Sequence, residues 1–117
     1  MPTAKEHRAQ AEHNEFFVAT LQNPFWDWAV TATFYAALHY VDAFLMTKGI
    51  DPEFHPDRNE YVRNDPTLTK IRSNYRQLQN DSRSARYDVV PYSQEDVRLL
   101  QEELKAIKNL LSPLIPR

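Results

Sequence analysis

A histidine and an aspartate lie three residues apart in the middle of the longest apolar stretch of the chain. If this stretch is helical, His39 and Asp42 share one face. A neutral imidazole beside a carboxylate could act as a general base towards a ribose 2′-hydroxyl. The two residues could instead form a buried polar network with Tyr35, because buried polar groups need hydrogen-bond partners. We favour the network and keep catalysis as the alternative.

Arginines form a second set of candidate residues, suited to binding phosphate. Residues 58–86 contain seven basic and three acidic side chains, although the net charge of the chain is only −2. On a helix, four arginines of this segment form one stripe, called here the basic stripe: Arg72, Arg76, Arg83 and Arg86. Such a stripe could bind nucleic-acid or nucleotide phosphates. It could also pair with the acidic Glu6, Glu12 and Glu15, within one protomer or across a dimer, and this is the interpretation we favour.

His55 and Arg58 lie in or beside a proline-containing segment after the apolar stretch, and functional residues are frequent in such loops. Both are weak candidates for catalysis, and His55 could also cap a short helix. The chain has no cysteine, and neither a His-x3-His nor a His-Glu-x2-His pattern occurs. We therefore predict no metal site and no cofactor.

The elements that must position these residues are helices, because prolines separate segments with helical periodicity. The expected helices cover residues 4–22, 25–48, 57–63, 65–87 and 93–111. Thr3, Asp65 and Ser93 suit N-caps, and Gly49 suits a left-handed C-terminal cap. The sequence therefore predicts an all-α fold, a four- to five-helix up-and-down antiparallel bundle, in a single domain over residues 1–117.

Periodicity also predicts which side of each helix is buried. The expected face of the first helix is Ala9, His13, Phe16, Phe17, Thr20 and Leu21. The expected face of residues 65–87 is Leu68, Ile71, Tyr75, Leu78, Ser82 and Ala85. The expected face of residues 93–111, extended by one turn, is Val97, Leu100, Leu104, Ile107, Leu111 and Leu114.

The stretch from Trp26 to Met46 predicts a central helix with one narrow polar side, called here the polar seam. Its members are Asp27, Thr31, Tyr35, His39 and Asp42. Charged residues inside the stretch make it unsuitable for a membrane, since each costs roughly 2.5 to 3.5 kcal/mol at mid-bilayer. The helix has more apolar surface than three neighbours can cover, which predicts a homodimer through this helix and its neighbours. The absence of cysteine and the polar N-terminus favour the cytoplasm.

The pattern of several of these residues is similar to the sequence motifs of a known family. The resemblance lies in Trp28 to Leu45, with its Phe34-Tyr35-Ala36-Ala37 run, then His39 and Ala43-Phe44-Leu45. It continues in Gly49, His55 and Arg58, in Tyr75-x-x-Leu78, and in Ser82-Arg83-x-Ala85-Arg86-Tyr87. Together these motifs resemble the HEPN domain over about half of the chain. The resemblance implies a helical bundle that is commonly dimeric, in proteins often associated with RNA cleavage, toxin–antitoxin pairs or defence.

The ribonucleases of that family use an arginine followed, after four to six residues, by a histidine on a late helix. No histidine follows Arg58 here, and the one match, Arg8 to His13, lies on the first helix, where chance explains it. We therefore predict a non-catalytic, dimeric interaction module for RNA or for a toxin–antitoxin or defence partner. One alternative is a divergent metal-independent ribonuclease that uses His39 or His55 with the basic stripe. Another is a nucleotide or small-ligand binder that uses the polar seam.

Overall fold

The computed structural model describes residues 2–20, 25–52 and 58–117 of the 117-residue chain. The helices are α1 (Ala4–Thr20), α2 (Trp26–Thr47), α3 (Arg58–Asn64), α4 (Arg72–Tyr87) and α5 (Gln94–Leu111), with 3-10 turns at Leu68–Ile71 and Ser112–Leu114. The described residues include no strand. The predicted all-α fold is confirmed.

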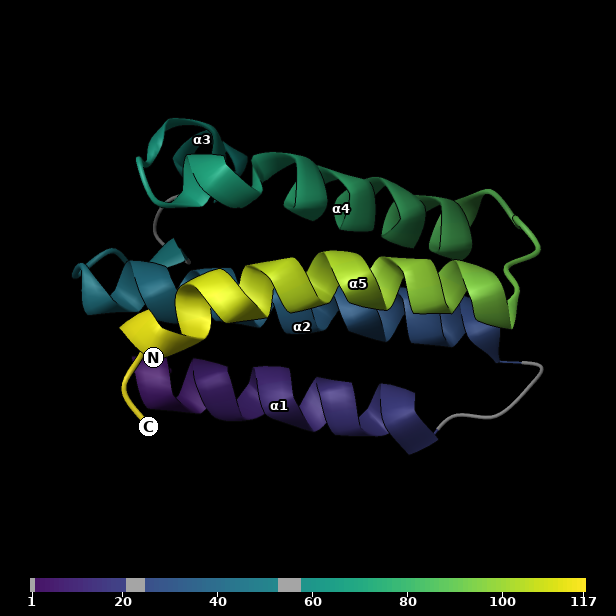
Figure 1. The fold of residues 1–117 in the computed structure, drawn as a ribbon, viewed down its shortest axis with the longest axis horizontal. Coiled ribbons are helices and arrows are strands. Elements are labelled where there is room, and N and C mark those ends of the chain that lie inside the picture. Colours follow the sequence, from purple (N-terminus) through teal and green to yellow (C-terminus); the bar gives the residue numbers. More distant parts are fainter. Residues whose placement is uncertain (1, 21–24, 53–57) are drawn as a thin grey trace.

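Helix α2 is the centre of the bundle, and α1, α4 and α5 pack around it. Figure 1 shows the chain running up and down: α1 and α4 are antiparallel to α2, whereas α5 runs in the same direction as α2. The short α3 lies at the end of the bundle where α2 finishes and α4 begins. This arrangement lets one helix present different faces to every other long helix.

Local sequence signals determine three of the helix ends. Ser93 accepts a hydrogen bond from the Asp96 amide and Asp96 accepts one from the Ser93 amide, which completes the capping box at α5. Thr3 and Glu6 form the same reciprocal pair at α1. Gly49 has φ +75° just after α2, as a left-handed cap requires. The three predicted termini at these places are confirmed.

The expected continuous helix over residues 65–87 is wrong over residues 65–71. Asp65 does act as a cap, because its Oδ1 accepts hydrogen bonds from the amides of Thr67 and Leu68. The segment that follows is a 3-10 turn, and Ile71 has φ −116° and ψ 18°, which are not helical values. α4 therefore begins only at Arg72.

The buried faces of α4 and α5 agree with the periodicity. Leu68, Ile71, Tyr75, Leu78 and Ser82 are buried, and Ala85 is partly buried. Val97, Leu100, Leu104, Ile107 and Leu111 are buried as well, whereas Leu114 is 49% exposed and was wrongly included. Leu114 belongs to the 3-10 turn, so the helical period no longer applies to it.

The predicted face of α1 is wrong. Phe16 is 71% exposed and Phe17 is 44% exposed, and the buried residues are His7, Arg8, Ala11 and Val18. Ala9, His13 and Thr20 are exposed too, and Leu21 lies outside the described residues.

Arg8 can be buried because protein oxygens take the place of water as hydrogen-bond acceptors for its guanidinium. It donates to the carbonyls of Ser112 and Ile115 at 3.0 and 2.8 Å, and to the Ser112 hydroxyl at 2.7 Å. These bonds fasten the C-terminal segment to α1. They lie about a hundred positions apart in the sequence, so helical periodicity could not reveal them.

α2 has the length and composition of a membrane-crossing helix. Thirteen of its 22 residues are nevertheless buried against the other helices, which is typical of the core helix of a soluble protein. Phe34, Tyr40 and Phe44 are in the core, and Trp26 and Met46 are partly buried. The expected excess of apolar surface on α2 is therefore confined mainly to Trp28, which is 58% exposed.

Candidate functional site

Three side chains of the polar seam of α2 contact three different helices. His39 contacts α1, Asp42 contacts α3, and Tyr35 contacts α4. No hydrogen bond joins Tyr35, His39 and Asp42 to one another among the described residues, so the predicted network between them is wrong. Each side chain bonds instead to a residue that is distant in sequence.

His39 lies opposite His7 of α1. Their Nδ1 atoms are 3.0 Å apart and their ring centroids 5.3 Å apart, so one ring donates its Nδ1 proton to the other. Burial lowers the pKa of His39, and so does the neighbouring His7, while Asp42 opposes this effect. The imidazole of His39 is consequently neutral at neutral pH, and it is partly exposed. Nothing in the local sequence around His7 indicates this pairing.

Asp42 is held by a two-pronged ion pair with Arg58 of α3. Arg58 Nε donates to Oδ1 at 2.5 Å, and its second terminal nitrogen donates to Oδ2 at 3.0 Å. Asp42 is only 3% exposed. Burial alone would lower the pKa of Arg58, but the hydrogen bond and charge of Asp42 raise it, so the guanidinium remains charged. The Asp42 carboxylate could have oriented His39, but it accepts its hydrogen bonds from Arg58 of α3 instead.

The other seam residues have structural partners. Tyr35 is 38% exposed, and its hydroxyl lies 3.4 Å from an Arg86 nitrogen, with the guanidinium also 5.6 Å from the ring centroid. The Thr31 hydroxyl donates to the carbonyl of Asp27, one turn earlier in α2. His55 lies outside the described residues, so its role stays a prediction from the sequence.

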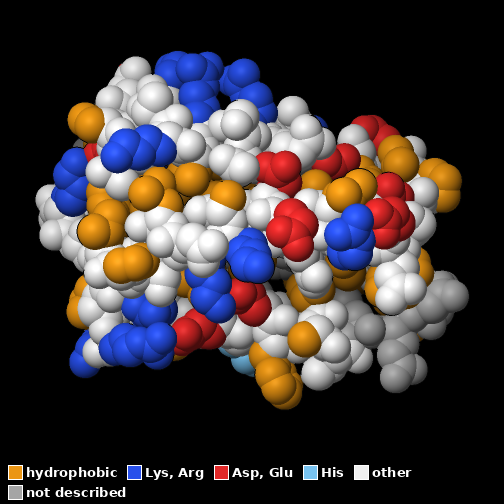
Figure 2. Space-filling model, in the orientation of Figure 1, with side chains coloured by type: hydrophobic (Ala, Val, Ile, Leu, Met, Phe, Trp, Pro, Cys, Tyr) orange, Lys and Arg blue, Asp and Glu red, His pale blue; other side chains and the backbone are white. Residues whose placement is uncertain are grey.

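The basic stripe divides between the two ends of α4. Arg86 donates to the Ser82 hydroxyl at 2.6 Å and reaches Tyr35. At the other end, Arg72 and Arg76 line a small hollow together with Arg63, Asn59, Val62, Tyr75 and Gln79. Figure 2 shows basic side chains gathered over this end, where α3 and the start of α4 lie.

The interpretation that the basic stripe pairs with α1 inside one protomer is wrong for the described residues. Glu12 lies 3.8 Å from Arg8, and Glu6 is used in its cap. Glu15 accepts hydrogen bonds from Tyr40 and Lys108. In the described parts of the chain, Arg72, Arg76 and Arg83 form no ion pair. Their charge is available for another molecule.

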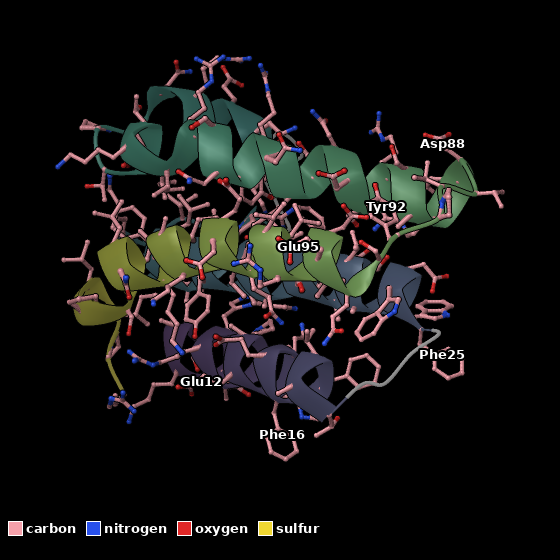
Figure 3. The ribbon with its side chains drawn as sticks, turned by 45° about the vertical axis from the view of Figure 1, so that its right-hand side comes forward. Glu12, Phe16, Phe25, Asp88, Tyr92 and Glu95 are labelled. Carbon is pink, nitrogen blue, oxygen red and sulfur yellow. The ribbon has the colours of Figure 1, made fainter. Side chains whose placement is uncertain are left out.

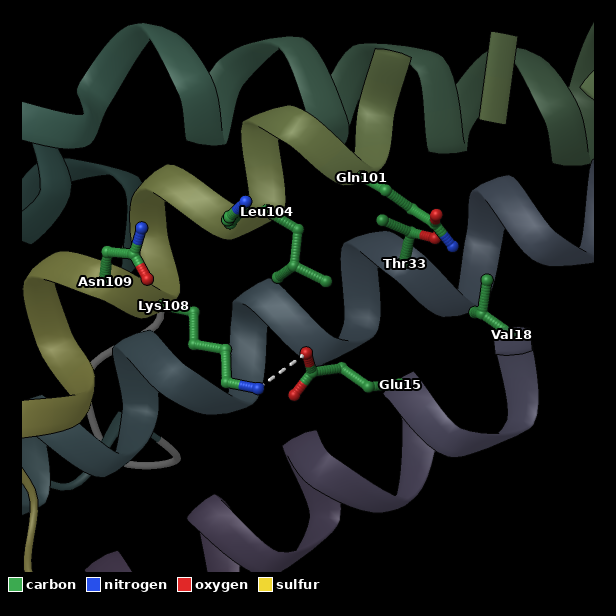
Figure 4. A pocket seen from close by; sticks show the side chains of 8 residues that line it. Glu15, Val18, Thr33, Gln101, Leu104, Lys108 and Asn109 are labelled. Atoms are coloured by element: carbon green, nitrogen blue, oxygen red, sulfur yellow. Dashed lines mark hydrogen bonds and ion pairs between the residues drawn. The ribbon is translucent and has the colours of Figure 1, made fainter. Parts of the chain in front are cut away.

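A separate cavity of about 410 Å³ lies between α1, α2 and α5. Figure 4 shows Lys108 reaching across it to Glu15, at 3.2 Å, with Leu104 and Thr33 nearby. Its walls also include Val18, Gln101, Lys105 and Asn109. The sequence pointed to two of these residues, Glu15 as a possible partner of the basic stripe and Leu104 as part of a buried face, but it predicted no cavity here. The cavity does not include the polar seam.

Exposed aromatic residues gather where α1 ends and α2 begins. This group, called here the aromatic end, consists of Phe16, Phe17, Phe25 and Trp28, which are between 44% and 71% exposed. Figure 3 shows Phe16 and Phe25 pointing away from the bundle. Exposed apolar patches can mark interaction sites, and these four side chains come from the neighbouring helices α1 and α2. Tyr35 extends the surface along α2.

Comparison with models of protein families identifies the family of this chain. The HEPN domain model matches residues 4–113, from the first residue of α1 to the turn after α5. Comparisons with curated proteins and with solved structures find no match. The family match covers nearly the whole chain, well beyond the segment that carried the sequence resemblance. This chain belongs to the HEPN domain family.

Proposed function

We propose that this protein is a non-catalytic HEPN domain, acting over residues 1–117 as a dimeric binding module. The observation that carries the proposal is the use of the candidate catalytic groups as helix contacts. His39 is bonded to His7, and Asp42 is bonded twice to Arg58. The catalytic spacing of the family's ribonucleases is also missing, since no histidine follows Arg58 in the chain. A cytoplasmic location remains a prediction from the sequence.

The aromatic end supports association with a second copy. Aromatic residues are enriched in the centres of protein interfaces, where they bury large areas at low entropic cost. Three of the four side chains are more than half exposed, and Phe17 is 44% exposed. The surface is formed by adjacent ends of α1 and α2, so a two-fold axis beside α2 would bury both copies of it.

We expect purified protein to have about twice the 13.8 kDa mass of one chain. Trp28→Glu should shift the mass towards the monomer, because it places a charge in the proposed interface. Light scattering after size-exclusion chromatography at micromolar concentration measures both. Leu99→Glu is the control, since Leu99 is 52% exposed on α5 and lies beside Gln77 and Asp81 of α4. A monomeric wild type, or equal dissociation by both variants, contradicts the proposed interface.

The unpaired arginines of the basic stripe support RNA as the binding partner. Arg76 and Arg83 are exposed and have no ion pair among the described residues. Guanidinium groups bind phosphate with good geometry and remain charged at all physiological pH values. The net charge of −2 means that such binding depends on this local group and not on the whole protein.

We expect the Arg76→Gln, Arg83→Gln double variant to bind single-stranded RNA more weakly, by a similar factor for different sequences. Each lost phosphate contact should reduce the slope of log affinity against log salt by about 0.7. Fluorescence anisotropy at several salt concentrations measures both quantities. Arg98→Gln is the control, because Arg98 is exposed on α5 and pairs with Glu95. An unchanged salt slope in the double variant removes the basic stripe from the RNA site.

The same RNA samples test the ribonuclease alternative. Incubation of structured and unstructured RNA with wild-type protein should give no cleavage above that of a buffer blank. Cleavage that His39→Ala abolishes, and that His13→Ala retains, would overturn the non-catalytic proposal. His13 is a suitable comparison because it is exposed on α1 and has no described partner.

A further inference from the structure

Two imidazoles and one carboxylate meet where α1 crosses α2. His7 comes from α1, and His39 and Asp42 come from successive turns of α2. One ligand atom from each residue lies within 4.8 Å of the other two, and the two Nδ1 atoms are 3.0 Å apart. His7 is 7% exposed and Asp42 3% exposed, so water competes little for these atoms.

We propose that His7, His39 and Asp42 bind one divalent transition-metal ion, with Zn²⁺ as the best fit. This inference is independent of the proposed dimer and RNA functions. Imidazole nitrogen suits zinc, copper, iron and nickel, whereas Mg²⁺ and Ca²⁺ prefer sites made only of oxygen. Ligand atoms on a tetrahedral zinc ion lie roughly 3.3 to 3.5 Å from one another, given bonds of about 2.0–2.2 Å. The imidazole pair is already close to that spacing.

The imidazole pair of His7 and His39 can provide two lone pairs without any net loss of protons, because one proton is shared between the two Nδ1 atoms. In the metal-free pair, one ring donates its Nδ1 proton to the other. If both rings carry their proton on Nε2, both Nδ1 lone pairs are free to bind a metal ion. The change is one of tautomer only.

Arg58 has two opposing effects on the site. It fixes the orientation of the Asp42 carboxylate with two hydrogen bonds, as partners of ligating carboxylates commonly do. Each carboxylate oxygen has a further lone pair, so one oxygen can still bind a cation. Arg58 also repels that cation. We therefore expect affinity in the micromolar range, below that of closed structural zinc sites.

The site leaves a coordination position open. Three protein ligands occupy three corners of a tetrahedron, and a water molecule can take the fourth, as in zinc sites that are accessible to solvent. His39 is partly exposed, so this position can face solvent. The prediction of no metal was based on the absence of a His-x3-His pattern. Such a pattern detects only ligands that share one helix.

The test uses tag-free, EDTA-treated full-length protein, titrated with Zn²⁺ alone in a calorimeter and with Co²⁺ alone in a spectrophotometer. We expect one equivalent to bind, with intense visible Co²⁺ absorption typical of tetrahedral coordination. His7→Ala and His39→Ala should each weaken binding at least about tenfold, since even residues that only support a ligand contribute that much. Asp42→Asn should weaken it similarly. His13→Ala should bind like the wild type.

A second measurement does not depend on whether the variants fold. Two-dimensional NMR of the wild-type imidazole nitrogens should show one ring of the His7–His39 pair protonated at Nδ1 before Zn²⁺ is added and both rings protonated at Nε2 afterwards, with His13 unaffected. Binding that is absent at millimolar Zn²⁺, or that His13→Ala weakens as much as His7→Ala does, overturns the site. Binding with unchanged affinity in Asp42→Asn overturns the three-ligand arrangement.

Discussion

Replacing Arg58 with leucine is expected to lower the free energy of unfolding by about 3–5 kcal/mol, because it leaves a buried carboxylate without its partner. Asp42 is 3% exposed and both of its oxygens accept hydrogen bonds from Arg58. The loss is a large fraction of the 5–15 kcal/mol that is typical of a domain. Urea denaturation at a fixed protein concentration, with EDTA present, measures it.

The matched control is a surface ion pair of the same chemistry. Arg98 and Glu95 are 58% and 62% exposed and pair through two hydrogen bonds on one turn of α5. Water solvates either charge when the other is removed, so Arg98→Leu should leave the denaturation midpoint nearly unchanged. An equal loss in both variants would contradict the assignment of Asp42 as a buried, dependent charge.

A double variant separates the ion pair from simple loss of packing. If Asp42 is replaced by leucine together with Arg58, no unpaired charge remains, and most of the lost stability should return. A cycle of the two single variants and the double variant gives the coupling between them. A coupling near zero would mean that Arg58 acts through its apolar stem and not through Asp42.

The fold was predictable wherever a helix carried its own signals. In α5, a capping box and a regular apolar repeat lie within one segment, and both agree with the structure. The prediction for α1 failed because its buried side is partly polar: the terminal nitrogens of Arg8 donate to Ser112 and Ile115, which are distant in sequence. Periodicity treats Phe16 as core and Arg8 as surface, although long-range hydrogen bonds reverse their roles.

The same reason limits what the sequence revealed about the site. The residues of the polar seam were identified correctly as one face of α2, because helical spacing is a local property. Their partners were not, since His7 and Arg58 belong to other helices. Whether His39 and Asp42 are read as structural or as catalytic residues depends on those partners. Candidate metal ligands on separate helices are hidden from any motif search for the same reason.

Replacing Ile107 with alanine is expected to lower the free energy of unfolding by about 2–5 kcal/mol, because the side chain is fully buried and the cavity cannot close completely. Ile107 is 0% exposed on α5, which packs on both α2 and α4. This decrease in the free energy of unfolding has two parts: the lost transfer free energy of the removed carbon atoms, and the lost van der Waals contacts around the cavity. Two-state urea unfolding followed by circular dichroism measures it.

Leu99→Ala is the control for this substitution, since it removes apolar carbon from the same helix where the side chain is 52% exposed. It should change stability by no more than about 0.5 kcal/mol. The contrast tests the position of α5 as well as its helical content, because both residues have similar volume and helix propensity. If Leu99→Ala were the more damaging variant, the face that α5 turns towards α2 would have to be reassigned, and with it the packing that holds the polar seam in place.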